Sequence, residues 1–316
     1  MSYLERALEL AERGRGTTHP NPVVGAVLVR DGEVVGEGWH ERKGEPHAEV
    51  NALAAAGDRA HGATLYVTLE PCAHLGATAP CTRAVIDAGV AKVVVGTRDP
   101  NPDAAGGLEK LREAGVQTEL AEGELGFRAR QQNEAWLTWV TKRRPFVTYK
   151  AATTLDGRLT LPGSRWISGE ESRRLVHELR AASDGVAVGM GTARADRPAL
   201  TARDVDAARQ PRRLVFGVGP LPPGVDLELI SGPLGEELER LAVQGVQSLL
   251  LEGGPTLAAS FMRADLIDKL LVFVAPRLSG AGPTLFSALD EPIALRRFES
   301  RRVGEDVLLT AYVNEP

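Results

Sequence analysis

The chain has 316 residues, of which 43% are hydrophobic and 25% charged, and its formal net charge is -5. This length suggests about two domains of ordinary globular composition, and the acidic balance argues against a broad nucleic-acid surface. The longest apolar runs are too short to span a bilayer, and the first residues lack the apolar core of a signal peptide. We therefore expect a cytoplasmic protein, and its two cysteines exclude a disulfide scaffold.

Alternating helical and extended patterns fill the N-terminal part. An amphipathic helix is predicted at 3–13, and two apolar runs joined by Asp31-Gly32 then predict a β-hairpin. Further helices are expected at 47–56, 81–88 and 106–114, and strands at 64–69, 92–97 and 116–121. This alternation indicates a layered α/β domain.

A helix is predicted over 126–142, with Trp136 and Trp139 interpreted as core or domain-interface packing. The basic run 142–144 is interpreted as a solvated helix end. A second α/β series follows, so we place the domain boundary near Pro145, which gives domains 1–144 and 145–316. Strands are expected near 146–152, 185–190, 213–218, 247–252, 269–275 and 303–313, and helices near 169–182, 234–243 and 255–263.

A histidine and a glutamate at a predicted helix start precede the only two cysteines. An H-x-E pair followed by a P-C pair is the signature of zinc deaminases. His47, Cys72 and Cys81 offer three ligands, which leaves the fourth position of a tetrahedral zinc ion open for water. Glu49 is expected to take a proton from the attacking water and pass it to the ring nitrogen and the departing ammonia. Alone, either half of this pattern is weak; together and in order they favour a catalytic zinc site.

The spacing of the cysteines points to one kind of deaminase. Nucleoside and nucleic-acid deaminases have two residues between them, whereas eight separate Cys72 from Cys81 here. With "HPNPVVGAVLV" (19–29) and "GWHERKGEPHAE" (38–49), this long loop resembles the deaminase half of the bifunctional riboflavin-biosynthesis deaminase/reductase family. The family's loop ends T-P-P-C, and Thr78-Ala79-Pro80-Cys81 departs from it by one residue.

Two further polar residues are candidates for contacts at the predicted zinc site. The resemblance implies that Asn21 contacts the pyrimidine substrate, although Asn21-Pro22 alone would be a turn before a strand. His74 lies inside the cysteine loop and could be a fourth ligand, a substrate contact or a loop residue. We prefer the latter two roles, because a fourth protein ligand would close the water position.

The C-terminal part resembles the reductase half of the same family, in the right order. The matching stretches are "VTYKAATTLDGRL" (147–159), "SRWIS" (164–168), residues 179–203 and "LLLEGGPTLAASF" (249–261), with Thr154 in place of the usual serine. The resemblance implies an α/β protein with a cytidine-deaminase-like three-layer N-terminal domain. Its C-terminal domain would have a dihydrofolate-reductase-like fold that binds NADPH.

Two glycine-containing stretches, 252–255 and 189–191, support nucleotide binding only weakly. An apolar strand ends at Glu252, two glycines follow, and Pro255 starts a helix whose free N–H groups suit a pyrophosphate. The same pattern also describes an ordinary strand-to-helix turn. Gly189 and Gly191 form a G-x-G without a third glycine, so the Rossmann fingerprint fails.

The resemblance also implies the contacts of the reductase. Its nicotinamide-nucleotide contacts fall at Ala152, Trp166, Ser168, Thr192, Asp196, Leu200, Gly254, Pro255, Thr256, Leu257, Ala258, Ala259 and Ser260. Its substrate contacts fall at Ser164, Arg180, Arg203 and Glu252. Arginine suits phosphate oxygens through its bidentate fork, although most arginines are simply solvated. Whether Lys150 donates a proton is open.

Together these features imply a bifunctional enzyme with Zn²⁺ and NADPH as cofactors. It would deaminate 2,5-diamino-6-ribosylamino-4(3H)-pyrimidinone 5′-phosphate and then reduce the ribosyl side chain to ribityl. We expect a phosphorylated pyrimidine as partner, a homo-oligomer, and neither nucleic acid nor membrane. A nucleic-acid or nucleoside deaminase with an appended nucleotide-binding domain predicts a basic groove and a C-x-x-C loop, and the sequence indicates neither. A non-catalytic nucleotide- or zinc-binding protein predicts loss of Glu49, which is present.

Overall fold

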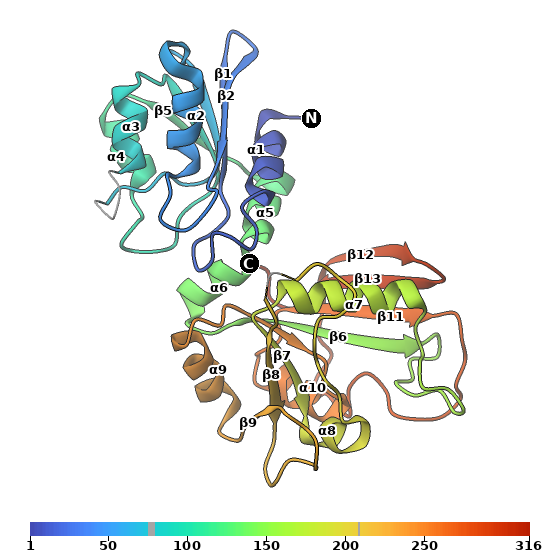
Figure 1. Ribbon diagram of the computed structural model, residues 1–316. Coiled ribbons are helices and arrows are strands. Elements are labelled where there is room, and N and C mark those ends of the chain that lie inside the picture. Colours follow the sequence, from blue (N-terminus) through green and yellow to red (C-terminus); the bar gives the residue numbers. More distant parts are fainter. Residues whose placement is uncertain (75–79, 208) are drawn as a thin grey trace. The chain divides into compact units, whose positions relative to one another are not determined.

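The computed structural model describes residues 1–74, 80–207 and 209–316, so Thr78 and Ala79 of the cysteine loop lie outside the described residues. The chain divides into two compact units, 1–142 together with Pro316, and 143–315 (Figure 1). Within the described ranges, no helix is long and apolar enough to cross a bilayer.

The first unit is built on a five-stranded sheet in the order β2-β1-β3-β4-β5. Its strands are β1 (Gly25–Arg30), β2 (Glu33–Trp39), β3 (Thr64–Leu69), β4 (Lys92–Thr97) and β5 (Gln117–Leu120). Its helices are α1 (Tyr3–Glu12), α2 (Ala48–Ala56), α3 (Cys81–Asp87), α4 (Gly107–Glu113), α5 (Gly123–Gln132) and α6 (Glu134–Lys142), with a short 3₁₀ helix at Gly57–Ala60. β3, β4 and β5 run parallel, whereas β1 is antiparallel to both of its neighbours.

The predicted hairpin is confirmed, because β1 and β2 pair in antiparallel register on either side of Asp31-Gly32. Both turn residues have positive φ, 54° and 83°, as the tight turn of a twisted hairpin requires. Helix α2 packs closely on this hairpin: a Cβ at Gly38 would lie only 2.4 Å from the backbone nitrogen of Ala52. This close approach fixes the start of α2, immediately after His47, against the sheet.

The second unit has an eight-stranded sheet in the order β12-β13-β11-β6-β10-β7-β8-β9. Its strands are β6 (Phe146–Thr154), β7 (Gly185–Gly189), β8 (Arg212–Phe216), β9 (Glu228–Ile230), β10 (Ser248–Leu251), β11 (Lys269–Ala275), β12 (Arg296–Val303) and β13 (Asp306–Tyr312). Its helices are α7 (Glu170–Ala182), α8 (Met190–Asp196), α9 (Leu234–Val243) and α10 (Pro255–Arg263). The strands from β11 to β9 are parallel, and β13 and β12 complete the sheet as an antiparallel edge.

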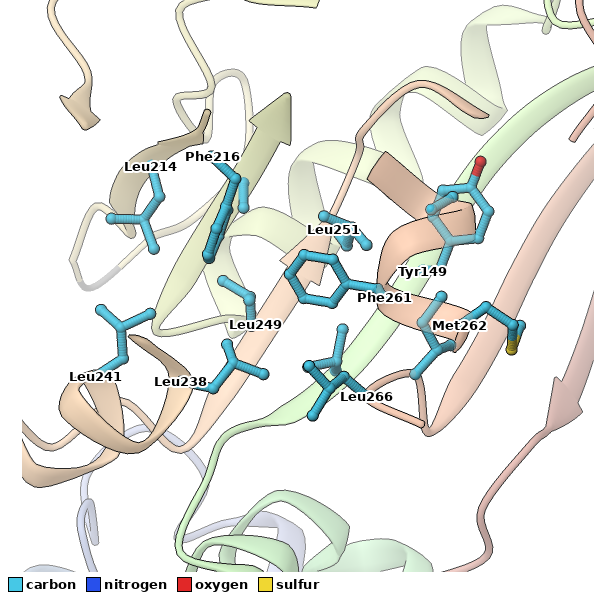
Figure 2. Close-up of a cluster of buried hydrophobic side chains, with 14 of the residues drawn as sticks. Tyr149, Leu214, Phe216, Leu238, Leu241, Leu249, Leu251, Phe261, Met262 and Leu266 are labelled. Atoms are coloured by element: carbon cyan, nitrogen blue, oxygen red, sulfur yellow. The ribbon is translucent and has the colours of Figure 1, made fainter. Parts of the chain in front are cut away.

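The main core of this unit lies between the central strands and helices α9 and α10 (Figure 2). Phe261 of α10 packs edge-on against Phe216 of β8, with ring centroids 5.3 Å apart and planes at 89°. Both rings are almost completely buried, as is Leu251 at the end of β10. This packing holds the carboxyl ends of β8 and β10 in place beside the helix that follows β10.

Several elements differ from the sequence-based expectations, and the short strand β9 had no predicted counterpart. The single helix predicted over 126–142 is two helices, because the buried Asn133 interrupts it: its side-chain amide donates to the Val23 carbonyl (2.8 Å) and accepts from the Val23 N–H (2.9 Å). The strand expected near 303–313 is a hairpin of β12 and β13, and α8 forms where the sequence showed only a G-x-G.

The interpretation of residues 142–144 as a solvated helix end was wrong for Arg144. Its guanidinium is buried and binds Asp268 through two hydrogen bonds, 2.6 and 2.8 Å long. The same carboxylate accepts the N–H of Val147 at the start of β6 (2.9 Å). A contact across 124 positions therefore anchors the first strand of the second unit.

Replacing Arg144 should test this anchor. We expect Arg144→Ala to lower the free energy of unfolding by about 3–5 kcal/mol, because the Asp268 charge stays buried without its partner. Arg240→Ala, which removes the exposed pair with Glu237, should change it by less than about 1 kcal/mol. Urea denaturation followed by circular dichroism measures both variants, and equal effects would contradict the anchoring role.

Candidate active sites

The three predicted metal ligands come from three different elements and meet at one point. His47 immediately precedes α2, Cys72 follows β3, and Cys81 is the first residue of α3. The Nδ1 atom of His47 lies 3.2 Å from the Sγ of Cys81 and 3.7 Å from the Sγ of Cys72. The three ligand atoms all lie within 4.8 Å of one another, and within the described part of the chain no fourth histidine, cysteine or carboxylate joins them.

The charge state of these side chains suits a divalent cation. Hydrogen bonding by the Cys81 thiol and by His47 lowers the pKa of Cys72 to about 4, against the opposing effect of burial. The hydrogen bond to the Cys72 thiolate, together with burial, raises the pKa of Cys81. Two sulfurs thus share one proton in a partly buried site. One imidazole and two thiols are a ligand set typical of zinc, and three ligands leave a coordination position open.

Glu49, in the first turn of α2, lies at the same site. It is 3% exposed, and its carboxyl lies beside the Cys81 thiol. Burial raises the pKa of this carboxyl, and the nearby His47 opposes the rise only in part. A raised pKa makes the carboxylate a stronger proton acceptor, which suits a general acid–base catalyst.

A cavity of about 460 Å³ opens onto this cluster. Asn21, His74, Trp136 and Trp139 line it, as do His47, Glu49 and Cys72. His40, Asp99 and Asn101 line it too, and no role had been assigned to these three from the sequence. The signal for the last two was available, because they directly follow β4, a strand parallel to β3.

The loop after β4 is held by a buried carboxylate. Glu70 accepts the N–H groups of Asp99 (3.1 Å) and Leu108 (2.9 Å), and both hydrogen bonds are buried. The side chain of Asp99 in turn accepts the N–H of Asn101 (2.8 Å). Burial and the nearby Glu70 raise the pKa of Asp99 to about 6, although the Asn101 hydrogen bond opposes them. Asp99 is therefore a second carboxyl group with a raised pKa at the cavity, besides Glu49.

In the second unit, Glu252 at the end of β10 forms one ionic cluster with Arg180 and Lys150. Glu252 and Arg180 are predicted substrate contacts, and Lys150 is the residue whose role was open. Glu252 accepts two hydrogen bonds from Arg180 of α7, at 2.6 and 3.0 Å, and one from Lys150 of β6 at 3.2 Å. Burial alone would raise the pKa of Glu252, but the charges and hydrogen bonds of Lys150 and Arg180 outweigh it and lower the pKa to about 2. Glu252 is thus a buried carboxylate that stays ionised at neutral pH.

The predicted nucleotide contacts fall into three groups. Thr192 lies beside the turn at 253–255: a Cβ at Gly254 would be 3.5 Å from its hydroxyl oxygen. Gly254 caps α10 and Pro255 begins it, whereas Ala258, Ala259 and Leu200 are buried in the cores. Asp196 is exposed at the end of α8, and Ala152 is half-buried in β6.

The predicted contacts between β6 and α7 are the nucleotide contacts Trp166 and Ser168, which form the third group, and the substrate contact Ser164. Ser164 donates its hydroxyl to the carbonyl of Trp166 (2.8 Å), and Ser168 accepts from Arg173 through its own carbonyl (2.7 Å). The indole of Trp166 is half exposed, with the guanidinium of Arg173 5.2 Å from its ring centroid. Among the described residues, no hydrogen bond or ion pair joins Ser164 or Trp166 to the Glu252 cluster.

Comparison with known families agrees with this division of sites. Residues 1–97 match the cytidine and deoxycytidylate deaminase zinc-binding region, and residues 145–309 match the RibD C-terminal domain. The zinc cofactor predicted at His47, Cys72 and Cys81 is thereby confirmed, and NADPH is implied by the reductase relationship. The predicted fold class, a cytidine-deaminase-like domain followed by a dihydrofolate-reductase-like domain, is confirmed as well.

Full-length relatives match both units together. The riboflavin biosynthesis protein RibD of Aquifex aeolicus is 40% identical over 351 residues, covering 98% of this chain and 97% of its own. RibD of Mycobacterium tuberculosis is 42% identical over 330 residues, covering 96% and 94%. A Thermotoga maritima diaminohydroxyphosphoribosylaminopyrimidine deaminase/5-amino-6-(5-phosphoribosylamino)uracil reductase superposes with a TM-score of 0.82 at 34% identity, over 98% and 97% of the two chains. The chain therefore belongs to the RibD family of bifunctional riboflavin-biosynthesis deaminase/reductases.

Proposed function

We propose that residues 1–144 deaminate the diaminopyrimidinone ribosylamino 5′-phosphate and that residues 145–316 reduce the deaminated product. The Thermotoga maritima relative is named for these two activities. The observation that carries the assignment is the cluster of His47, Cys72 and Cys81 beside the buried Glu49 at a cavity of about 460 Å³. Such a cavity is large enough for a small ligand and lies in the first unit alone.

In the deaminase, zinc when bound would be held by His47, Cys72 and Cys81 and would act as a Lewis acid that activates water. Glu49 accepts a proton from the attacking water and delivers it to the ring nitrogen. In a second transfer it passes a proton to the amino group, which departs as ammonia. Asn21 supports substrate orientation from the cavity wall, where its amide nitrogen lies 3.4 Å from the Nε2 atom of His40. His74 contacts the substrate rather than the metal, since it lines the cavity but lies outside the ligand cluster.

In the reductase, NADPH would supply a hydride to C1′ of the ribosyl group in an opened, imine-like form. Gly254, residues 255–260 of α10 and Thr192 would hold the cofactor, because free N–H groups at a helix start suit a pyrophosphate. Ala152, Trp166, Ser168, Asp196 and Leu200 complete this contact set. Ser164, Arg180, Arg203 and Glu252 bind the substrate. The ionised Glu252 is suited to accept hydrogen bonds from ribose hydroxyl groups, because Lys150 and Arg180 hold its charge in place.

We also propose a cytoplasmic homo-oligomer. The two free cysteines of the zinc cluster favour a reducing compartment. The edge strand β12 is exposed along most of its length, and its Phe298 is 63% exposed. An exposed edge strand with a large apolar side chain is a surface that a second copy can cover.

Glu49 gives the sharpest test of the deaminase. We expect Glu49→Gln to lower kcat for ammonia release by about 10²–10⁴-fold, because the amide cannot carry the proton. Zinc content, measured by atomic absorption, should stay at the wild-type level. Glu45→Gln changes a more exposed glutamate that lines the same cavity and should retain most activity. Full deamination by the Glu49 variant would remove this residue from the mechanism.

Loss of the metal should separate the two activities. We expect chelation, or Cys72→Ser, to abolish ammonia release while NADPH oxidation with the deaminated intermediate continues, because the zinc ligands all belong to the first unit. Re-addition of Zn²⁺ should restore the chelated protein. Loss of NADPH oxidation in parallel with ammonia release would contradict the assignment of the two reactions to two units.

The Glu252 cluster predicts a pH-dependent stability. The folded pKa of about 2 lies below the usual 4.5, so its stabilising effect is present above pH 4.5 and is lost as pH falls toward 2. We expect Glu252→Gln to lower the free energy of unfolding at pH 7 by about 3 kcal/mol, and the difference from wild type to shrink below pH 4. Glu239→Gln, an exposed control on α9, should change little. A pH-independent difference would contradict this account.

A further inference from the structure

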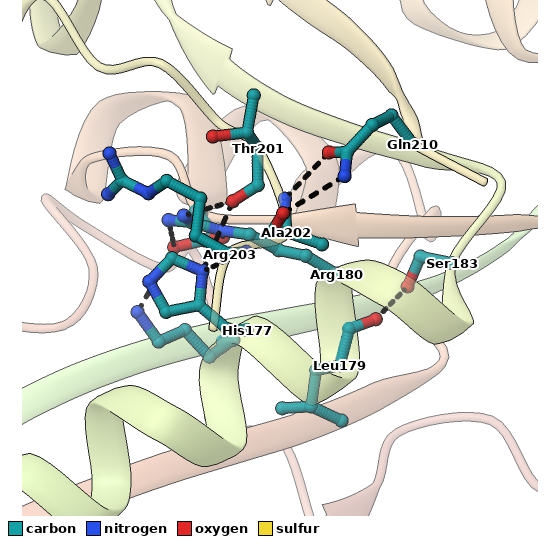
Figure 3. Close-up of polar contacts among 10 residues, drawn as sticks. His177, Leu179, Arg180, Ser183, Thr201, Ala202, Arg203 and Gln210 are labelled. Carbon is teal, nitrogen blue, oxygen red and sulfur yellow. Dashed lines mark hydrogen bonds and ion pairs between the residues drawn. The ribbon is translucent and has the colours of Figure 1, made fainter. Parts of the chain in front are cut away.

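The turn at residues 201–203 lies between two residues whose backbone conformation is uncommon for their residue types. Leu200 before it and Asp204 after it have φ values of 54° and 59°, in the left-handed region where residues other than glycine are uncommon. Such residues persist only where the surroundings determine the backbone. Side chains distant in sequence supply that constraint, and Figure 3 shows their contacts converging on this turn.

Gln210 holds the centre of the turn with both ends of its amide. Its Oε1 atom accepts the N–H of Ala202 and its Nε2 atom donates to the carbonyl of Ala202, each at 2.9 Å. Both backbone groups of one residue are thereby satisfied by a single side chain, much as a neighbouring strand would satisfy them. Ala202 itself is buried, so solvent does not offer these groups an equivalent partner.

His177 of α7 faces the other groups of the turn. Its Nδ1 atom lies 3.1 Å from the carbonyl oxygen of Thr201 and 3.2 Å from the backbone nitrogen of Arg203. One ring nitrogen can serve only one of them, as donor to the first or acceptor from the second. Arg180 already donates to the Thr201 carbonyl (3.2 Å). The arrangement in which every group is satisfied therefore has Nδ1 accepting from Arg203, with the ring proton on Nε2.

The protonation of His177 agrees with this arrangement. Burial, with the charge of Arg180, lowers the pKa of His177, which favours the neutral ring. A neutral imidazole has one unprotonated nitrogen that can accept a hydrogen bond, whereas an imidazolium has none.

The side chain that this turn presents is a free cation. Arg203 is exposed, and among the described residues no hydrogen bond or ion pair involves its guanidinium. By contrast, Arg180 spends three of its N–H groups on Glu252 and Thr201. Figure 3 shows the Arg203 side chain extending away from Gln210. Arg203 thus keeps its bidentate fork available for an anion, on a backbone that Gln210 and His177 hold still.

We propose that Gln210 and His177 are positioning residues that fix the 201–203 turn so that Arg203 can bind the 5′-phosphate of the reductase substrate. The inference rests on the substrate-binding role given to Arg203 in the proposed function. Neither residue touches the substrate; each acts through the backbone of the turn. The energetic reason is that a pre-ordered arginine loses less conformational freedom when the phosphate binds.

A double-mutant cycle in the full-length, zinc-loaded protein tests this. We expect Gln210→Leu to raise KM for the deaminated 5′-phosphate substrate about tenfold, with KM for NADPH unchanged. Arg203→Ala should raise the same KM about 50-fold. In the Arg203→Ala background, Gln210→Leu should then change KM for this substrate little further, because the arginine that Gln210 positions is absent. Gln244→Leu, which removes a surface glutamine bonded to Arg212, serves as the matched control and should leave both KM values unchanged.

A second pair of variants tests the acceptor role of His177. His177→Leu should raise KM for the phosphorylated substrate, whereas His177→Asn should largely preserve it, because an amide oxygen can replace Nδ1 as acceptor. The positioning role would be overturned if Gln210→Leu had equal effects in the presence and absence of Arg203. It would also be overturned if Gln210→Leu left KM for the phosphorylated substrate unchanged. Either result would leave the substrate role of Arg203 intact. An unchanged KM in Arg203→Ala would overturn both this inference and the substrate role of Arg203. Inhibition by inorganic phosphate gives an independent readout and should weaken in the same variants.

Discussion

In each unit some of the polar side chains of the site follow parallel strands at the carboxyl end of a sheet. Cys72 and Asp99 come after β3 and β4, which pair in register from Thr64 with Lys92 onward. Glu252 comes after β10, which pairs with β7 and β6. Strand register therefore positions Cys72, Asp99 and Glu252, since a slip by one residue would turn the following side chains to the opposite face.

The two sites differ in how their charges are balanced. In the second unit, Glu252 is neutralised by Lys150 and Arg180 before any ligand arrives. In the first unit, two sulfurs share one proton, and the adjacent imidazole of His47 favours the thiolate form of Cys72. Binding a metal there must displace the proton that Cys81 keeps, so protons and metal compete for the cluster. The side chains of the reductase site thus balance the charge of Glu252 by themselves, whereas the deaminase site needs its metal.

Local sequence signals predicted most of the elements well, because each depends on neighbouring residues. The hairpin at Asp31-Gly32 and the helix starts at His47 and Cys81 are such cases. The misses have causes far away in the sequence: Asn133 breaks a helix through Val23, and Arg144 is buried through Asp268, across 110 and 124 positions. No local pattern carries such pairings.

The candidate sites show the same limit. The sequence brought forward His47, Glu49 and the two cysteines because their spacing is distinctive. It did not single out Asp99, whose place at the cavity depends on the pairing of β4 with β3 and on the buried Glu70. Strand β12 was missed for another reason, since nearly all its residues are exposed and apolar alternation, the usual mark of a strand, is absent.

The position of Glu49 joins the fold to the chemistry. Its burial raises the carboxyl pKa, and the same burial places the carboxyl beside the metal ligands, where a cation would favour its charged form. Burial raises the pKa of the carboxyl and a nearby cation lowers it, so neither the protonated nor the ionised form is strongly favoured. A group that must accept a proton in one step and return it in the next needs this balance. The close packing of α2 on β2, which permits only glycine at position 38, is what holds Glu49 where both influences act.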